Sequence, residues 1–356
     1  MSVEIIGLFA HRAESDSLAS AEAAFDTAFM KQLTEDYEHA GYDRMLIATS
    51  ASWADSLSIA SYLSGLTRSL KFLIAHRPGI VSPTAAARML ATIDQLSGGR
   101  VGVHIISGAS DIELQSDGDF VVKDQRYKRS AEYAQVLRAI WTTREPFDHD
   151  GTFYRFNRGH SRVRPVQKPA IPIFWGGASG DALAMAASAA DIYAFGIEPL
   201  DRTSALIETF RGHCHAAGRS VGLCLSSKII TGETEAEAWA YAQDLRSAAL
   251  AKAKAQGRVP AGLDVNERRR EMLDMADVQD KRLWLGLNKA QGGTGHFVSL
   301  VGTGEQVADA LLDYYDLGVR SFLFHGFDIA NDPKRFGRSL IPALREGIAR
   351  REVRAA

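Results

Sequence analysis

The segment from Ile171 to Gly180 (IPIFWGGASG) carries the residues best suited to bind a phosphate. A short apolar run enters two glycines, a small residue and a serine, and an alanine-rich helical pattern begins at once. Unpaired backbone N–H groups and the helix dipole both favour an anion at such a helix N-terminus. The glycines also let the backbone come close to a ligand. We predict a phosphate site at Gly177, Ala178 and Ser179; an ordinary strand-to-helix turn explains the local pattern equally well.

The composition gives no sign of a nucleic-acid-binding or membrane protein. The 356 residues are 46% apolar and carry a net charge of −2, so neither nucleic acid nor an anionic membrane is expected as a partner. Cys214 and Cys224 lack a metal-type spacing, and core packing in a reducing compartment suits them best. No apolar run approaches the roughly 18 residues of a membrane helix, and the N-terminus lacks a signal-peptide layout. We expect a soluble cytoplasmic protein.

Short apolar runs alternate with amphipathic stretches along the whole chain. Strands are predicted at 3–9, 44–48, 71–75, 101–106, 171–175, 191–195, 223–230 and 321–324. Helices are predicted near 22–40, 53–65, 83–97, 126–143, 180–190, 201–217, 234–256, 304–317 and 333–350. This alternation indicates an α/β protein with one domain over residues 1–356, and the strand count favours a closed (β/α)8 TIM barrel. An open doubly wound sheet is the alternative.

Two segments interrupt the alternation. Residues 146–168 contain FDHDGTFY, which predicts a small hairpin with an Asp-Gly turn, and then a basic stretch. Residues 251–297 are polar and highly charged, and they close with GGTG. A long irregular insertion in a barrel is often an active-site lid, and flanking glycines permit a hinge. We expect 251–297 to be such a lid, with a solvated surface excursion as the alternative.

In a barrel, substrate and cofactor meet at the C-terminal ends of the strands. The predicted ends carry histidines, serines and aromatic residues but no pair of carboxylates, which argues against glycoside hydrolysis. His76, His104 and His325 could converge on a metal, but the further ligands are missing and no metal is predicted. Neither a Gly-x-Ser-x-Gly elbow nor a Walker sequence occurs. The site is therefore expected to hold a planar, phosphorylated organic cofactor that supplies the difficult chemistry.

Histidine is the side chain that transfers protons near neutral pH. His11 at the end of the first strand, His76 after the third and His325 after the eighth are the acid–base candidates. Lys228 on the seventh strand adds a cation to this catalytic set. A structural role explains each histidine at least as well.

Several motifs, in order along the chain, resemble those of one enzyme family. They lie at 71–78 (KFLIAHRP), 82–88 (SPTAAAR), 94–100 (DQLSGGR), 118–119 (GD), 126–127 (RY), 130–133 (SAEY), 174–179 (FWGGAS) and 292–295 (GGTG). The chain thus resembles, over nearly its whole length, the bacterial-luciferase-like flavin monooxygenases, and within them the alkanesulfonate monooxygenase branch. The resemblance implies a (β/α)8 barrel with an insertion after the seventh strand. It also implies reduced FMN from a separate NAD(P)H-dependent reductase, and a homodimer or homotetramer.

The resemblance further implies where a flavin would lie. Ala75 and His76 would lie beneath the isoalloxazine ring, where the family often has an unusual peptide bend, and His104 would replace an asparagine. Tyr127 would reach the flavin from the helix after the fourth strand, although ordinary helix packing is the alternative, as a core role is for His104. The implied cofactor-binding residues are Ala75, His104, Ser107, Tyr127, Ser130, Gly177, Ala178 and Ser179.

The substrate side departs from the alkanesulfonate pattern. The cysteine after the second strand is replaced near Trp53, the Arg-x-His pair of the seventh strand reads Ser226-Ser227-Lys228, the lid arginine is Gln291, and the tyrosine after the eighth strand is Phe327. A sulfonate needs charge-assisted donors, and most of them are lost. Lys228 could substitute for one. Trp53, Phe327 and Trp175 would make the pocket more apolar, which suits a neutral sulfur compound, sulfone, amine or ketone.

Three functions follow from the resemblance. The first is a two-component monooxygenase in which reduced FMN and O2 form a C4a-(hydro)peroxyflavin that inserts one oxygen atom into a small organic substrate, such as an alkanesulfonate or another organosulfur compound. The second is a deazaflavin-dependent oxidoreductase of the same fold. The third is a flavin-binding protein without turnover. We expect the first.

Overall fold

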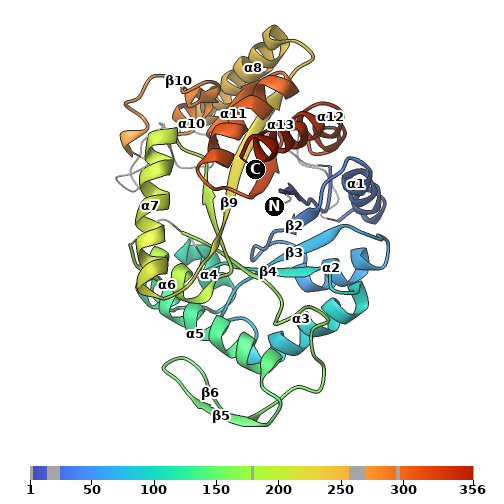
Figure 1. The fold of residues 1–356 in the computed structure, drawn as a ribbon, viewed down its shortest axis with the longest axis vertical. Helices are drawn as coiled ribbons and strands as arrows, with labels where there is room; N and C mark the ends of the chain where they lie inside the picture. The colour runs from blue at the N-terminus through green and yellow to red at the C-terminus, as the bar shows by residue number, and fades with distance from the viewer. Residues whose placement is uncertain are drawn as a thin grey trace.

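Eight parallel strands form a closed barrel in the computed structural model, which describes residues 3–13, 25–108, 110–177, 180–255, 270–293 and 297–355 (Figure 1). The strands are β1 (Glu4–Leu8), β2 (Arg44–Ile47), β3 (Lys71–His76), β4 (Val101–Ile105), β7 (Ile173–Gly176), β8 (Ile192–Gly196), β9 (Gly222–Thr231) and β13 (Ser321–His325). They pair in chain order, and β9 closes the ring by pairing with both β8 and β13. The predicted (β/α)8 barrel is confirmed, and the open sheet was the wrong alternative.

Helices alternate with these strands and cover the barrel. They are α1 (Thr27–His39), α2 (Ser56–Ser64), α3 (Pro83–Ser97), α4 (Asp111–Ser116), α5 (Lys123–Thr142), α6 (Gly180–Ala189), α7 (Leu200–Ala216), α8 (Glu235–Ala255), α10 (Gly286–Ala290), α11 (Gly304–Asp316), α12 (Asp332–Arg338) and α13 (Leu340–Ala355). The helix predicted at 333–350 is in fact two, α12 and α13, because Ser339 leaves the helical conformation. In the described parts of the chain, no helix has the length and apolarity to cross a membrane.

The barrel interior is closed at its N-terminal end by an ion pair. Arg44 Nη2 lies 3.0 Å from Glu4 Oε1, and the guanidinium lies 5.5 Å from the centre of the Phe174 ring. Gly102 leaves the room for this guanidinium, since a Cβ there would lie 2.8 Å from Arg44 Nη1. Burial by itself would raise the pKa of Glu4, but Arg44 and Lys71 outweigh burial and lower it. The carboxylate therefore stays charged in the barrel floor.

An apolar layer lies above this floor. It consists of Ile6, Leu46, Leu73, Ala75, Phe174, Ala194, Cys224 and Leu323, one inward-facing position from nearly every strand. Residues at the alternate positions point outward and pack against the helices in a larger second core. Trp175 belongs to this outer core and is fully buried, so it does not form the apolar substrate wall expected of it.

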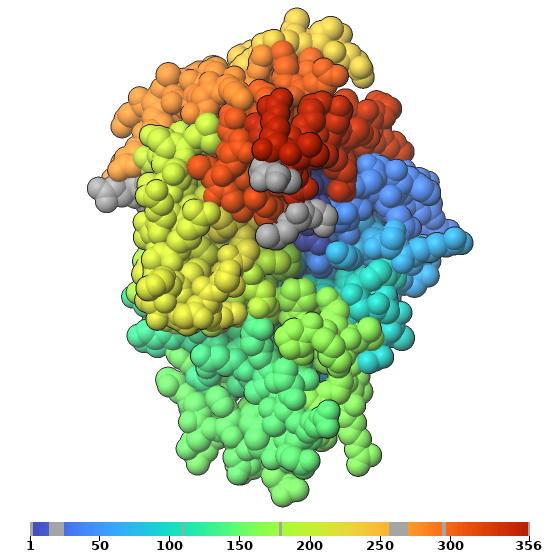
Figure 2. Space-filling view, viewed as in Figure 1, coloured from blue at the N-terminus to red at the C-terminus, as the bar shows by residue number. Residues whose placement is uncertain are grey.

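The predicted hairpin is present at 146–168, but its turn differs from the one expected. Strands β5 (Phe147–Asp150) and β6 (Arg155–Gly159) pair antiparallel with Asp150 opposite Arg155. Four residues, 151–154, therefore connect the strands, and Gly151 donates its N–H to Tyr154 O at 3.0 Å. Asp150 and Gly151 thus lie at the start of the loop, and Glu132 on α5 fixes its far side by accepting the N–H groups of Phe153 and Tyr154. The hairpin projects from one end of the molecule (Figures 1 and 2).

Much of the segment predicted as a lid is regular structure. Strand β12 (Ser299–Gly302), which the sequence did not indicate, pairs with the C-terminal half of β9, and β11 (Leu283–Trp284) and β10 (Val278–Gln279) add antiparallel to it. Trp284 is 1% exposed and packs in a satellite core beneath α8. Residues 256–269 and 294–296 lie outside the described residues. A lid over 251–297 remains a prediction.

Asp94 fastens α3 to the segment that leads from the hairpin into β7. Its fully buried carboxylate accepts N–H groups from Val166 (2.7 Å), Gln167 (3.2 Å) and the Gln167 amide (2.7 Å). We expect Asp94→Ala to lower the free energy of unfolding by about 2–4 kcal/mol in a denaturant titration, because buried amides lose their acceptor. Asp244→Ala, at an exposed position of α8, should change it by less than about 0.5 kcal/mol. Equal losses in the two variants would refute the role of Asp94.

Candidate functional site

Four polar side chains face the interior at the C-terminal end of the barrel. They are His104 on β4, Ser226 and Lys228 on β9, and His325 on β13. The last three lie two or four positions beyond Cys224 or Leu323, which face inward on the same strands. His104 is the register partner of Ala75 and Phe174, which also face inward. Each is partly exposed, whereas Ser227 and Ile229, their outward-facing neighbours on β9, are buried. The barrel mouth is therefore open, and we refer to these four residues as the inner rim.

Within the part of the chain that the structure describes, neither ring nitrogen of His104 has a hydrogen-bond partner. Part of the residue is exposed, yet Nδ1 and Nε2 are both buried and without a hydrogen bond. Its register partners are Ala75 on β3 and Phe174 on β7. Burial lowers the pKa of His104 to about 4, so the ring is neutral at pH 7 and offers one donor and one acceptor. Buried polar atoms without a partner are uncommon, so this ring is a candidate for a functional role.

The predicted phosphate turn lies beside His104 and faces α5. Gly177 has φ +130°, which L side chains rarely adopt, and a Cβ there would lie 2.8 Å from Ala182 Cβ. That Cβ position is 3.6 Å from the Tyr127 hydroxyl oxygen and 3.5 Å from the ring. Tyr193 donates its hydroxyl to Gly177 O at 2.8 Å and fixes the turn from β8. Ala178 and Ser179, the other predicted phosphate ligands, lie outside the described residues.

The remaining residues predicted around the cofactor also meet here. Ser107, just after β4, donates its hydroxyl to Ser130 Oγ on α5 at 3.1 Å. The structure thus brings Ser107, Tyr127, Ser130 and Gly177 to one side of the mouth, from three separate segments. Ala75, in the apolar layer, is the register partner of His104 and lies beside it on β3.

The opposite side of the mouth is formed by β9 and β13. Ser226 Oγ lies 3.0 Å from His325 Nε2. The Lys228 ammonium lies 4.5 Å from the centre of the Phe327 ring and 5.4 Å from that of Phe297, both within cation–π range. Phe327 is itself only 2% exposed, so its ring supports Lys228 from below and lines little of the pocket.

His76 lies on the outer face of β3, away from the mouth. Its Nε2 lies 2.6 Å from the Tyr133 hydroxyl, which donates to Val81 O at 3.0 Å. Because Tyr133 donates its only hydroxyl proton to Val81, His76 must donate its Nε2–H to the Tyr133 oxygen. Burial lowers the pKa of His76 to about 4. The ring is a neutral, structural contact. The strand continues in regular pairing through His76, opposite Ile105, so no bend separates it from Ala75.

His11 and Trp53 come together at the edge of the mouth. Their ring centres lie 5.6 Å apart in an edge-to-face contact, and Trp53 is 50% exposed. Gln291 ends α10, which packs against α8. The sequence thus placed His11 and Trp53 correctly as neighbours of the strand ends.

Three buried arginines, which no prediction included, hold the segment after β4. Arg77 pairs with Glu113 at 3.1 Å and also with Asp117, Arg126 with Asp111 at 2.8 Å, and Arg129 with Asp119. The segment contains α4, a helix that was also missed. Ser110 caps it and Asp111 and Glu113 occupy its first turn, a start signal that the sequence does contain.

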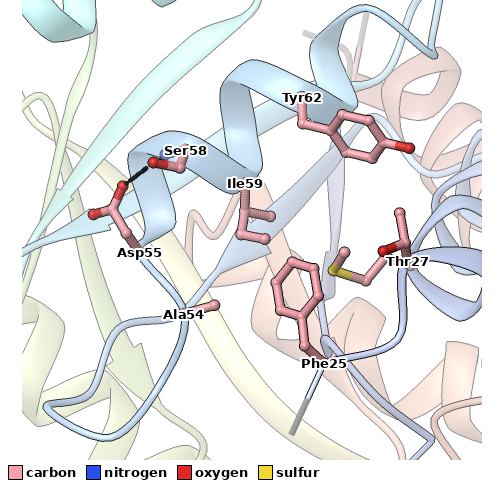
Figure 3. Close-up of a pocket in the computed structure, with 8 residues that line it drawn as sticks. Phe25, Thr27, Ala54, Asp55, Ser58, Ile59 and Tyr62 are labelled. Carbon is pink, nitrogen blue, oxygen red and sulfur yellow. Dashed lines mark hydrogen bonds between the residues drawn. The ribbon is translucent and has the colours of Figure 1, made fainter. Parts of the chain in front are cut away.

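An apolar cavity of about 280 Å³ lies between α1 and α2, outside the inner rim (Figure 3). Its one carboxylate, Asp55, caps α2 by accepting the N–H of Ser58 at 2.8 Å. None of the predicted site residues lines it. Among the described residues, no group of three or more metal-binding side chains occurs either.

Comparison with known proteins now decides the family. A sequence model described as luciferase-like monooxygenase matches residues 3–321. The chain belongs to the luciferase-like monooxygenase family. The strand-by-strand order of the barrel and the match over most of the chain agree with the resemblance inferred from the motifs.

Solved structures from the luciferase-like monooxygenase fold share this architecture. DmoA from Hyphomicrobium sulfonivorans is 21% identical, with a TM-score of 0.78 over 97% of this chain and 88% of that chain. The oxygenating constituent of 3,6-diketocamphane monooxygenase from Pseudomonas putida, in complex with FMN, is 17% identical, with a TM-score of 0.66 over 96% of both chains. A coenzyme F420-dependent tetrahydromethanopterin reductase from Methanopyrus kandleri is 15% identical, with a TM-score of 0.71 over 97% of this chain and 100% of that chain.

The two neutral histidines should make this luciferase-like protein less stable in acid. Their pKa of about 4 in the folded protein lies below the usual 6.5, so the unfolded chain binds more protons between these values. Stability is complete above pH 6.5 and should fall by about 3 kcal/mol per histidine as the pH drops to 4. In denaturant titrations across this range, His104→Asn should remove about half of the loss in unfolding free energy that His76 and His104 together cause. The exposed His215→Gln should leave it unchanged; an unaltered slope in His104→Asn would refute the buried neutral ring.

Proposed function

We propose that the protein is a two-component monooxygenase that uses reduced FMN and O2 to insert one oxygen atom into a small organic substrate. The single observation that carries the proposal is His104, whose two buried nitrogens lack a partner among the described residues and which lies close to the turn at Gly177. The family match supports the monooxygenase class. The proposal includes a separate NAD(P)H-dependent reductase as the source of reduced FMN, and a homodimer or homotetramer.

The residues at the mouth fit a flavin with a phosphate tail. The left-handed backbone at Gly177 brings the start of the turn close to any ligand, because no Cβ stands between them. Tyr127, Ser107 and Ser130 add hydroxyl groups on the same side. The partly exposed His104 ring and the apolar layer that contains Ala75 would contact the flavin ring.

Reduced FMN, when bound, supplies the two electrons with which one atom of O2 joins the substrate while the other leaves as water. The chain's own residues would bind the cofactor, orient it and exclude water from the site. The Glu4–Arg44 pair and the apolar layer close the barrel from below, so ligands enter from the inner rim. His104 remains neutral above about pH 4 and orients the cofactor as a hydrogen-bonding group, with no charge to disturb it.

The substrate would lie on the side of β9 and β13. Ser226, His325 and Lys228 supply polar groups there, and the rings beneath Lys228 make the surroundings apolar. The proposed substrate class is organosulfur compounds, of which alkanesulfonates are the anionic members. With one ammonium in place of guanidinium forks, we expect a sulfonate to be held less firmly than in an arginine-lined pocket.

Reoxidation of the flavin tests the monooxygenase directly. Reduced FMN with the purified protein is mixed with O2 and a panel of sulfonates, sulfones, thioethers and amines. We expect flavin reoxidation to be slower than in free solution, and at least one substrate to yield a product carrying one oxygen atom from O2. Binding without any turnover would support a flavin-binding protein and refute the proposal.

A deazaflavin-dependent oxidoreductase is the second candidate, because a coenzyme F420-dependent enzyme shares the fold. We expect reduced FMN to bind more tightly than reduced F420 in anaerobic titrations. Tyr127→Phe should weaken FMN binding about tenfold if its hydroxyl holds the phosphate, since about 1.4 kcal/mol corresponds to one hydrogen bond. Tyr62→Phe, on the exposed surface of α2, is the control and should bind normally. Tighter binding of reduced F420 would favour the deazaflavin enzyme.

A further inference from the structure

We propose that Ser226 and His325 form a proton-transfer pair that serves the oxygen chemistry at the mouth. The inference rests on the proposed function and specifies which histidine acts. Both residues face the interior, one on β9 and one on β13, and both are partly exposed. Ser226 Oγ lies 3.0 Å from His325 Nε2, a distance at which a proton passes directly between them.

The other histidines near the strand ends are placed less well for this role. His76 points outward and donates its N–H to the Tyr133 hydroxyl oxygen. His104 has a pKa of about 4 and is neutral at pH 7, so it orients a ligand better than it delivers a proton. His11 lies beyond β1 against the Trp53 ring. His325, by contrast, lies within hydrogen-bond distance of a hydroxyl that itself faces the mouth.

Barrel closure holds the pair in place. Leu323 is the register partner of Ser226, and His325 is that of Lys228, so the His325 ring reaches back along the strand to Ser226. Ser226 is held from its other side, because its carbonyl accepts the N–H of Ile197 at 2.8 Å. Behind the loop that follows His325, Asp332 accepts the N–H groups of Phe327 and Asp328 at 2.7 and 2.8 Å. The pair is therefore fixed by two strands and one anchored loop.

The proton step balances as follows. The oxygen atom that leaves as water must gain protons. Protonated His325 gives its Nε2 proton to Ser226 Oγ while the Ser226 hydroxyl proton passes to that oxygen. One N–H and one O–H bond break and two O–H bonds form, so Ser226 is unchanged and His325 becomes neutral. His325 then regains a proton from water at the open mouth.

Other titratable groups lie near this pair and would also affect the pH dependence of turnover. Lys228 is the register neighbour on β9, and His104 lies on the inner rim from β4. Asp332 lies directly behind Gly326, and burial raises its pKa to about 6. Asp332→Asn therefore belongs in the experiment, so that a limb near pH 6 can be assigned to the correct group.

The test compares His325→Gln and Ser226→Ala with Ser227→Ala, whose serine is the next residue but points outward and is buried. We expect His325→Gln to lower kcat at least about 100-fold, since general acid–base groups contribute about that much. The variant should also lose the alkaline limb of the wild-type pH profile, because the protonated ring is the acid. Ser226→Ala should lower kcat less, and Ser227→Ala and Asp332→Asn should keep the limb. Added imidazole should restore turnover to His325→Gly, and affinity for reduced FMN should stay within about threefold in all variants.

A second measurement needs no turnover. In the ligand-free protein, the imidazole NMR signal that His325→Gln removes should change its chemical shift in Ser226→Ala and stay unchanged in Ser227→Ala, because of these two serines only Ser226 contacts the ring. If the wild type is active and His325→Gln has the same kcat, the proton-transfer pair is refuted and the monooxygenase proposal stands. An inactive wild type overturns the monooxygenase, and the NMR comparison then decides whether the pair exists. Equal effects of Ser226→Ala and Ser227→Ala in either measurement overturn it.

Discussion

The pairing of β9 with both β8 and β13 is the constraint on which the rest of the molecule depends. Side chains alternate strictly between two faces of a strand, so closure assigns every strand residue either to the interior or to the helices. A slip of one residue in β9 would turn Ser226 and Lys228 outward and bring Ser227 into the mouth. The site is thus a consequence of sheet register before it is a matter of individual side chains.

The same residue type has opposite uses on the two faces. His76 lies outside β3 and its N–H has a partner in Tyr133, whereas His104 lies inside β4 and both its nitrogens lack one. Burial lowers the pKa of both to about 4. Of these two rings, only that of His104 has both nitrogens buried without a partner among the described residues. Burial alone therefore does not identify a functional histidine; the fate of its nitrogens does.

The mouth is divided between two tasks. Hydroxyl groups and a glycine turn gather on the side of β4, α5 and β7, while Ser226, His325 and Lys228 gather on the side of β9 and β13. The segment after β4 is held down by buried arginines paired with carboxylates that are more exposed. It escaped notice in the sequence because acidic residues on a short helix look like solvated surface until their partners, distant in the chain, are known.

The sequence by itself determined the alternation of elements, the closed barrel and the family, because apolar periodicity and turn residues are local and the motifs are long and ordered. It also predicted most residues that reach the mouth, since strand ends can be located from the same patterns. The tertiary structure decided the direction of each side chain, as with Trp175 and His76, and the partner of each polar group. It also decided that 299–302 extends the sheet as β12 and that a four-residue loop connects the strands of the hairpin. Those outcomes depend on contacts between residues far apart in the chain, such as Glu132 with the hairpin loop, and local pattern carries no information about them.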